Sequence, residues 1–199
     1  MKKPKYIMIW GSNLFLELHQ NELGTISLGD TWSFKLKKHR VDNFSMKSLD
    51  SKKTIDYMLK ILKTNNNYDI AIIELGLVDL INILECNETI DVFKQNLLQI
   101  ITILKYKGIK PIVFTLCPLV ASSFKLKNNL NVSDEDIILT HKRINKVIKE
   151  LAAEYEIDLI DDNKAITKKK SSYLNDDGQT VNGLGNDLIK NMLDRKSVV

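Results

Sequence analysis

Short uninterrupted runs of apolar residues recur along the chain and predict strands. The clearest occupy residues 6–10, 69–74 and 110–116, and each is closely followed by a glycine or a proline. Continuous apolar runs of this length are typical of parallel strands that are buried on both faces of a sheet. Weaker runs occupy residues 41–44 and 157–161. The pattern therefore predicts five strands.

Apolar residues at helical spacing fill the segments between these strands. In residues 51–64 they form one stripe, and Ser51 is available as the N-cap. Acidic residues follow Ser133, where the dipole of a starting helix favours negative charge. Gly108 provides a C-terminal stop for the preceding helix. The predicted helices occupy residues 32–38, 51–64, 88–106, 133–155 and 184–195.

The alternation of strands and helices determines the predicted fold class. Strand–helix–strand units place helices on both faces of a parallel sheet. We therefore expect an α/β protein, a three-layer α/β/α sandwich with a flavodoxin-like parallel five-stranded sheet. Residues 1–199 contain no internal repeat and no linker rich in proline or glycine, which predicts a single domain. In such sheets, ligands bind beyond the carboxyl ends of the strands.

Composition and charge narrow the range of partners. The 29 basic and 25 acidic residues give a formal charge of +4, and the basic run at residues 168–170 is too short for a nucleic-acid-binding arm. Two cysteines are too few for a disulfide framework. The apolar run at residues 6–10 is shorter than a signal-peptide core or a membrane span. The sequence predicts a cytoplasmic protein with no nucleic-acid partner, and it leaves the oligomeric state open.

Polar residues suited to chemistry follow the predicted strands. Ser12 comes directly after the first strand, where it can act as a nucleophile or cap a following helix. Asp79 follows the third predicted strand and is a candidate helix cap. A long polar loop is predicted from residue 117 to residue 131, and Asp177-Gly178 predicts a tight turn. These loops are where a ligand site is expected.

Taken together, these segments resemble the SGNH hydrolases, also called the GDSL esterase/lipase superfamily. Trp10-Gly11-Ser12 stands where the family has Gly-Asp-Ser, and Gly76-Leu77-Val78-Asp79 stands where it has Gly-x-Asn-Asp. Asp177-Gly178-Gln179-Thr180 stands where it has Asp-Gly-x-His. Residues 115–119 resemble the Thr-x-x-Pro run after the fourth strand, and residues 32–36 match the helix before the second. The resemblance covers nearly the whole chain and implies ester substrates.

The resemblance implies roles for individual residues. Ser12 takes the position of the nucleophile, and Asp177 takes that of the carboxylate that orients the catalytic histidine. Thr180 replaces that histidine, and Val78 replaces the asparagine of the oxyanion hole. The residues expected at the substrate are Gly11, Asn13, Gly76, Val78 and Asp79.

A second register of the first motif stays open. Gly11-Ser12-Asn13 can also be aligned with Gly-Asp-Ser, which places Asn13 at the nucleophile position. The register with Ser12 as nucleophile is preferred because it leaves the first strand at its usual length.

The catalytic base is the main departure from the family. Threonine cannot accept a proton at neutral pH, and loss of a triad member removes several orders of magnitude of rate. His19 is the first candidate for a substitute base and His141 the second, whereas His39 is expected on the far side. The chain has no His-x-x-x-His, Cys-x-x-Cys or Gly-x-Gly-x-x-Gly motif, so no metal and no cofactor are expected.

Two functions remain after these departures. The first is an esterase or acyltransferase that acts on an O-acylated carbohydrate with a remodelled and weakened site. The second is a pseudoenzyme, a catalytically inactive protein that binds a carbohydrate or a protein partner in the same cleft. A flavin-binding or receiver protein shares the architecture, but a receiver needs an acidic pair after the first strand, and Gly11-Ser12-Asn13 offers none.

Overall fold

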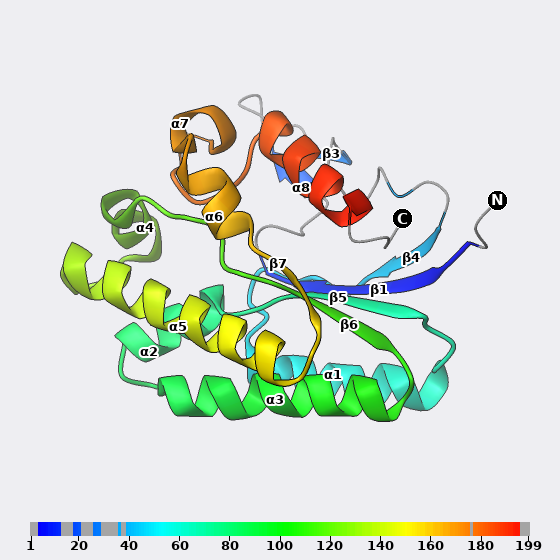
Figure 1. The fold of residues 1–199 in the computed structure, drawn as a ribbon. Coiled ribbons are helices and arrows are strands. Elements are labelled where there is room, and N and C mark those ends of the chain that lie inside the picture. Colours follow the sequence, from blue (N-terminus) through cyan, green and yellow to red (C-terminus); the bar gives the residue numbers. More distant parts are fainter. Residues whose placement is uncertain are drawn as a thin grey trace.

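A five-stranded parallel sheet forms the centre of the protein, as the sequence predicts (Figure 1). The computed structural model describes residues 4–12, 18–20, 26–28, 36, 39–175 and 177–195. In spatial order the strands are β4 (Arg40–Asn43), β1 (Tyr6–Gly11), β5 (Ile70–Glu74), β6 (Lys110–Phe114) and β7 (Asp158–Ile160). Because the order reverses at β1, loops after β1 and β5 lie at the position where ligands bind in open α/β sheets.

Helices cover both faces of this sheet and form the outer layers of the predicted sandwich. Figure 1 shows α1 and α3 below the sheet and α6, α7 and α8 above it. The helices are α1 (Ser51–Thr64), α2 (Leu77–Leu84), α3 (Ile90–Tyr106), α4 (Ala121–Asn128), α5 (Asp134–Glu154), α6 (Asp162–Thr167), α7 (Lys170–Tyr173) and α8 (Gly183–Arg195). Among the described residues, no helix is both long enough and apolar enough to span a bilayer.

Alternate side chains of the strands fill two separate cores. Met8 and Trp10 of β1 belong to the core between the sheet and helices α1, α3 and α5. Ile7 and Ile9 belong to the core on the other face, between the sheet and helices α6 and α8. All four side chains are at most 1% exposed. Successive side chains of a strand point to opposite faces, so a strand covered on both sides must be apolar throughout. This requirement explains why residues 6–10 form an uninterrupted apolar run.

The structure corrects three details of the sequence prediction. The N-cap of α1 is Asp50, whose Oδ1 accepts a hydrogen bond from Lys53 N at 2.7 Å, and Ser51 is the first helical residue. Asp79 lies in the first turn of α2, whose N-cap is Gly76. The segment predicted as a loop up to residue 131 contains α4.

In two further segments the described structure cannot be matched to a predicted element. A separate antiparallel pair, β2 (Leu18–Gln20) and β3 (Ile26–Leu28), was not predicted. The predicted helix at residues 32–38 lies largely outside the described residues.

Gly76, between β5 and α2, occupies a position that only glycine fits. Its φ is +120°, and a Cβ there would lie 2.9 Å from Cγ2 of Ile144. We expect Gly76→Ala to lower the free energy of unfolding by about 2–4 kcal/mol, because it adds backbone strain and a steric clash. Denaturant unfolding measures this change.

The matched control is Gly108→Ala at the end of α3. Gly108 also has a positive φ, +71°, but beyond its chain neighbours no described atom lies within 4 Å of the place that a Cβ would take. This variant is expected to lose only about 1 kcal/mol, the backbone cost alone. Equal losses in the two variants would contradict the role assigned to Ile144.

Candidate functional site

The loop after β1 is held to the end of β5 by a buried contact between Ser12 and Glu74. Gly11 pairs with Glu74 in the parallel ladder, which brings the next residue, Ser12, beside the Glu74 side chain. Ser12 N and Ser12 Oγ both donate hydrogen bonds to Glu74 Oε2, at 3.1 and 3.3 Å. The two residues are 1% and 2% exposed. The hydroxyl at the expected nucleophile position is therefore covered in this conformation and directed at a carboxyl group.

Glu74 is the acidic group that ends an otherwise apolar strand. Burial raises the pKa of Glu74 from an ordinary 4.5 to about 8, the hydrogen bond from Ser12 N lowers it, and the charge of Asp162 raises it further. At neutral pH this carboxyl group is therefore mostly protonated. Glu74 was not predicted as a site residue, although an acid at the end of a buried strand is a signal that could have identified it.

A second buried acid, Asp162, lies just after β7 at the same carboxyl edge of the sheet. It is the first residue of α6, is 0% exposed, and its Oδ1 accepts a hydrogen bond from Thr115 Oγ1 at 2.5 Å. Burial raises the pKa of Asp162 to about 7, although hydrogen bonds from Thr115 and Asn163 lower it. Burial also raises the pKa of the Cys117 thiol, and the charges of Asp162 and Glu74 add to that effect. At neutral pH the carboxyl edge thus contains a mostly protonated Glu74, an Asp162 that is about half ionised, and a protonated thiol.

The position expected to correspond to the oxyanion asparagine carries an apolar side chain, and the acid beside it holds two helices together. Val78 is half-buried in the first turn of α2. Asp79 is 0% exposed, and its Oδ1 accepts hydrogen bonds from Ser51 N at 3.0 Å and Ser51 Oγ at 2.5 Å. Burial raises the pKa of Asp79, although both hydrogen bonds from Ser51 lower it. Asp79 thereby ties the start of α2 to the start of α1.

Asp177 organises the tight turn that precedes α8. Its Oδ1 accepts hydrogen bonds from Gln179 N at 3.0 Å and Thr180 N at 2.9 Å. Its Oδ2 accepts from Thr180 Oγ1 at 2.9 Å and from Lys127 Nζ at 3.0 Å. Burial opposes ionisation here, but these hydrogen bonds outweigh it and hold the pKa of Asp177 below its ordinary value. Asp177 is therefore an ionised carboxylate whose partner at position 180 is a hydroxyl.

The turn with Asp177 and the loop with Ser12 make different contacts. Val120 N, just before α4, donates a hydrogen bond to Gly178 O at 2.8 Å, so the turn packs against the start of α4, in the segment that follows β6. The hydrogen bonds described for Ser12 instead go to Glu74 at the end of β5. β5 and β6 are adjacent in the sheet, so both segments belong to the same carboxyl edge.

The histidines have separate environments. His141 on α5 is 8% exposed, and its Nε2 lies 2.9 Å from Cys117 O, so Nε2 carries the proton because a carbonyl only accepts. Burial lowers the pKa of His141, the bond to Cys117 raises it, and the charge of Lys170 lowers it, with a net decrease. His39 Nδ1 accepts from Lys5 N at the opposite, amino end of β1. The side chain of His19 and all of Asn13 lie outside the described residues.

Potential metal ligands do not gather at this edge. Within the part of the chain that the structure describes, no group of three or more His, Cys, Asp or Glu side chains is arranged to hold a metal ion.

The same architecture occurs in known esterases and lipases. The chain is similar to the lipase/acylhydrolase from Enterococcus faecalis, with a TM-score of 0.74 and 20% identity over 96% of this chain and 94% of that one. It is also similar to an acetylxylan esterase from Geobacillus stearothermophilus, with a TM-score of 0.71 and 13% identity over 98% and 96% of the two chains. A structure described as an SGNH hydrolase, from Slackia heliotrinireducens, matches with a TM-score of 0.70 and 13% identity over 98% and 99%.

These similarities define the fold. The strand order and the near-complete coverage show that the chain has the SGNH hydrolase fold, as its motifs predict. No protein-family model and no curated protein sequence matches the chain. The function therefore has to follow from the residues of this chain's own site.

Proposed function

We propose that this chain is an SGNH-fold protein that binds an acylated carbohydrate or a related ligand at the carboxyl edge of its sheet, without hydrolysis by a Ser–His–Asp triad. The observation that carries this proposal is the hydrogen bond from Thr180 Oγ1 to Asp177 Oδ2 at 2.9 Å. A threonine hydroxyl at that position donates to the carboxylate, as a histidine would, but it cannot then remove a proton from a nucleophile.

The environment of Ser12 supports the same proposal. A nucleophilic hydroxyl has to reach a carbonyl carbon, but Ser12 is 1% exposed and its Oγ donates to Glu74. The side chain of Val78 offers no donor to a developing oxyanion, and loss of one such donor costs about 10²–10³ in rate. Each of these features removes a different requirement of acyl transfer.

The ligand class is proposed from the structural relatives. The Geobacillus stearothermophilus relative is an acetylxylan esterase, a name that specifies an acetylated sugar polymer. In this chain the half-buried Asp177 and Thr180 and the exposed Asn175 carry carboxylate, hydroxyl and amide groups at one turn of the carboxyl edge, and these groups suit hydrogen bonds to a sugar. A carbohydrate ester is thus the first ligand to test.

Two measurements test the proposal together. Hydrolysis of p-nitrophenyl acetate by the wild type and by Ser12→Ala is expected to proceed at the same low rate, and calorimetry with acetylated xylo-oligosaccharides is expected to detect binding. Hydrolysis that falls at least tenfold in Ser12→Ala would contradict the proposal. Absence of binding, together with equal hydrolysis rates, would reject the carbohydrate ligand.

A second candidate function is a slow esterase or acyltransferase in which Glu74 replaces the histidine. The contact of 3.3 Å between Ser12 Oγ and Glu74 Oε2 favours it. The ionised Glu74 would take the Ser12 proton as Oγ bonds to the acyl carbon, and would return it to the departing alkoxide. Water would then cleave the acyl-serine. Because the pKa of Glu74 is about 8, this hydrolysis is expected to rise with pH up to about 8 and to disappear in both Ser12→Ala and Glu74→Gln.

A further inference from the structure

A groove between α5 and the start of α6 combines buried polar side chains with several lysines. It has a volume of about 300 Å³. Its α5 lining follows positions 141, 142, 145, 146, 149 and 150, which form one continuous stripe of a helix. Asn163 of α6 closes the opposite wall. The residues that line the groove are His141, Lys142, Asn145, Lys146, Lys149, Glu150 and Asn163.

The floor of this groove is fixed by the loop that follows β6. Asn145 is 6% exposed, its Oδ1 accepts from Leu116 N at 2.6 Å, and its Nδ2 donates to Leu116 O at 3.2 Å. Asn163 Nδ2 donates to the same carbonyl at 3.0 Å. His141 is held by Cys117 O at 2.9 Å. The groove is therefore preorganised, which lowers the entropic cost of binding.

The charges around the groove favour an anion. Lys149 is paired with Asp161 at 2.8 Å, and Lys146 makes a long surface contact with Glu150 at 3.7 Å, which contributes little. Lys142 is exposed.

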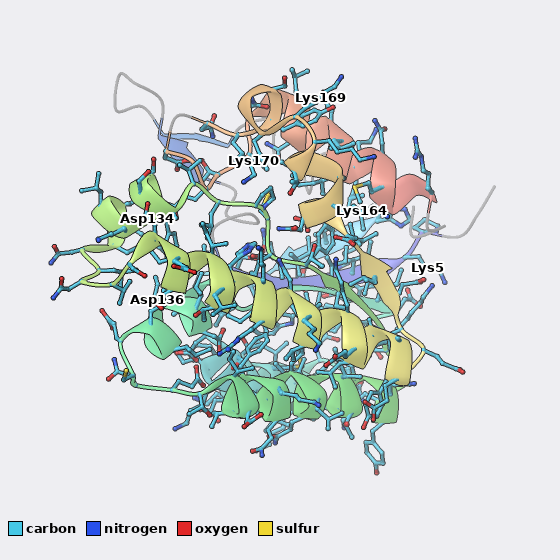
Figure 2. The ribbon with its side chains drawn as sticks, turned by 60° about the vertical axis from the view of Figure 1, so that its left-hand side comes forward. Lys5, Asp134, Asp136, Lys164, Lys169 and Lys170 are labelled. Carbon is cyan, nitrogen blue, oxygen red and sulfur yellow. The ribbon has the colours of Figure 1, made fainter. Side chains whose placement is uncertain are left out.

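Further cations lie beyond the rim of the groove. In the view of Figure 2, Lys164 and Lys170 lie above α5. The charge of Lys170 acts on His141, where it contributes to the lowered pKa of the imidazole. Among the residues that line the groove itself, three are lysines and one, Glu150, carries a carboxylate.

We propose that this groove binds a small phosphate-bearing anion through Lys142 and Lys146, with His141 and Asn163 on its walls. Lysine binds phosphate as a flexible point charge, and two lysines balance the charge of a phosphate monoester. The groove lies on α5, and the proposal does not depend on the proposed function because it requires no reaction at Ser12.

The test is an NMR titration of the full chain with inorganic phosphate, at constant ionic strength maintained with chloride. We expect saturable shifts of the His141 imidazole and of the Asn145 and Asn163 side-chain amides. The variant Lys142→Gln/Lys146→Gln is expected to weaken binding at least tenfold. Shifts that increase without saturation, or equal affinity in the variant, would overturn the proposal.

A matched control and two further ligands make the result specific. Lys60→Gln/Lys63→Gln removes the same charge from exposed positions of α1 and is expected to leave the affinity unchanged. Glucose 6-phosphate is expected to shift the same signals as inorganic phosphate, whereas glucose is expected to shift none. A loss of affinity in the control equal to that in the groove variant, or equal shifts with glucose, would overturn the assignment.

Discussion

Replacing Glu74 by glutamine is expected to stabilise the protein at pH 8.5 by several kcal/mol and to flatten the decline of its stability above pH 5. Glu74 is 2% exposed, and its pKa of about 8 lies above the ordinary 4.5. Each pKa unit corresponds to about 1.4 kcal/mol, so the whole displacement has an upper limit on the order of 5 kcal/mol. Glutamine keeps an acceptor for Ser12 and carries no charge to bury.

The direction of this pH dependence follows from proton linkage. Between pH 4.5 and about 8 the folded protein binds the Glu74 proton more tightly than the unfolded chain does. Its free energy of unfolding therefore falls as pH rises through this window and becomes constant above it. Asp162 acts in the same direction, with a pKa of about 7. The lowered pKa of Asp177 acts only at more acidic pH.

Denaturant unfolding at several pH values between 5 and 9 measures this effect. The control is Glu85→Gln, which changes an exposed glutamate and is expected to leave the slope against pH unchanged. A wild-type slope that persists undiminished in Glu74→Gln would show that Glu74 is not the group responsible.

Installing histidine at position 180 is expected to restore esterase activity only when a serine is also placed at position 13. Asp177 already accepts a hydrogen bond from position 180, so Thr180→His supplies a base with its orienting carboxylate. The Ser12 hydroxyl is buried and directed at Glu74, so we do not expect the new histidine to remove its proton. We expect Asn13→Ser/Thr180→His to hydrolyse p-nitrophenyl acetate at least about 100-fold faster than either single variant, as a general base typically contributes.

This experiment also separates the two registers of the first motif. Ser12-dependent activity in Thr180→His alone would establish Ser12 as the nucleophile and reject the register with Asn13. Asp177→Asn in the double variant is the control, because it should remove the gain by leaving the new histidine without its partner. A double variant no faster than the wild type would contradict the assignment of position 180 to the catalytic edge.

The sheet was predictable because each of its main strands is marked by a short apolar run that is local in the sequence. Residues 6–10, 70–73 and 111–114 are apolar at every position, which is typical of strands covered on both faces. Helix α4 was missed because its sequence has no apolar stripe and only Ala121 and Phe124 are buried. The hairpin of β2 and β3 was missed because strands of three residues leave little periodic signal.

The candidate site was predictable only as a set of loops. The motif positions proposed for Ser12, Asp177 and Thr180 were predicted along the chain, together with the proposed replacement of a histidine by Thr180. Their partners could not, since Glu74 lies 62 residues from Ser12, and Lys127 lies 50 from Asp177. These contacts depend on which strands are neighbours.

The sequence by itself determined the class of fold, the carboxyl edge as the place for a ligand, and the chemical groups available there. Alternating apolar runs and helical stripes are sufficient for this, because burial of apolar surface depends mainly on pattern. Only the tertiary structure decided that Ser12 is covered and bound to Glu74, that burial raises the pKa values of Glu74 and Asp162, and that a lysine groove lies on α5. Exposure and pKa depend on how completely distant segments exclude water, and no local stretch of sequence specifies that.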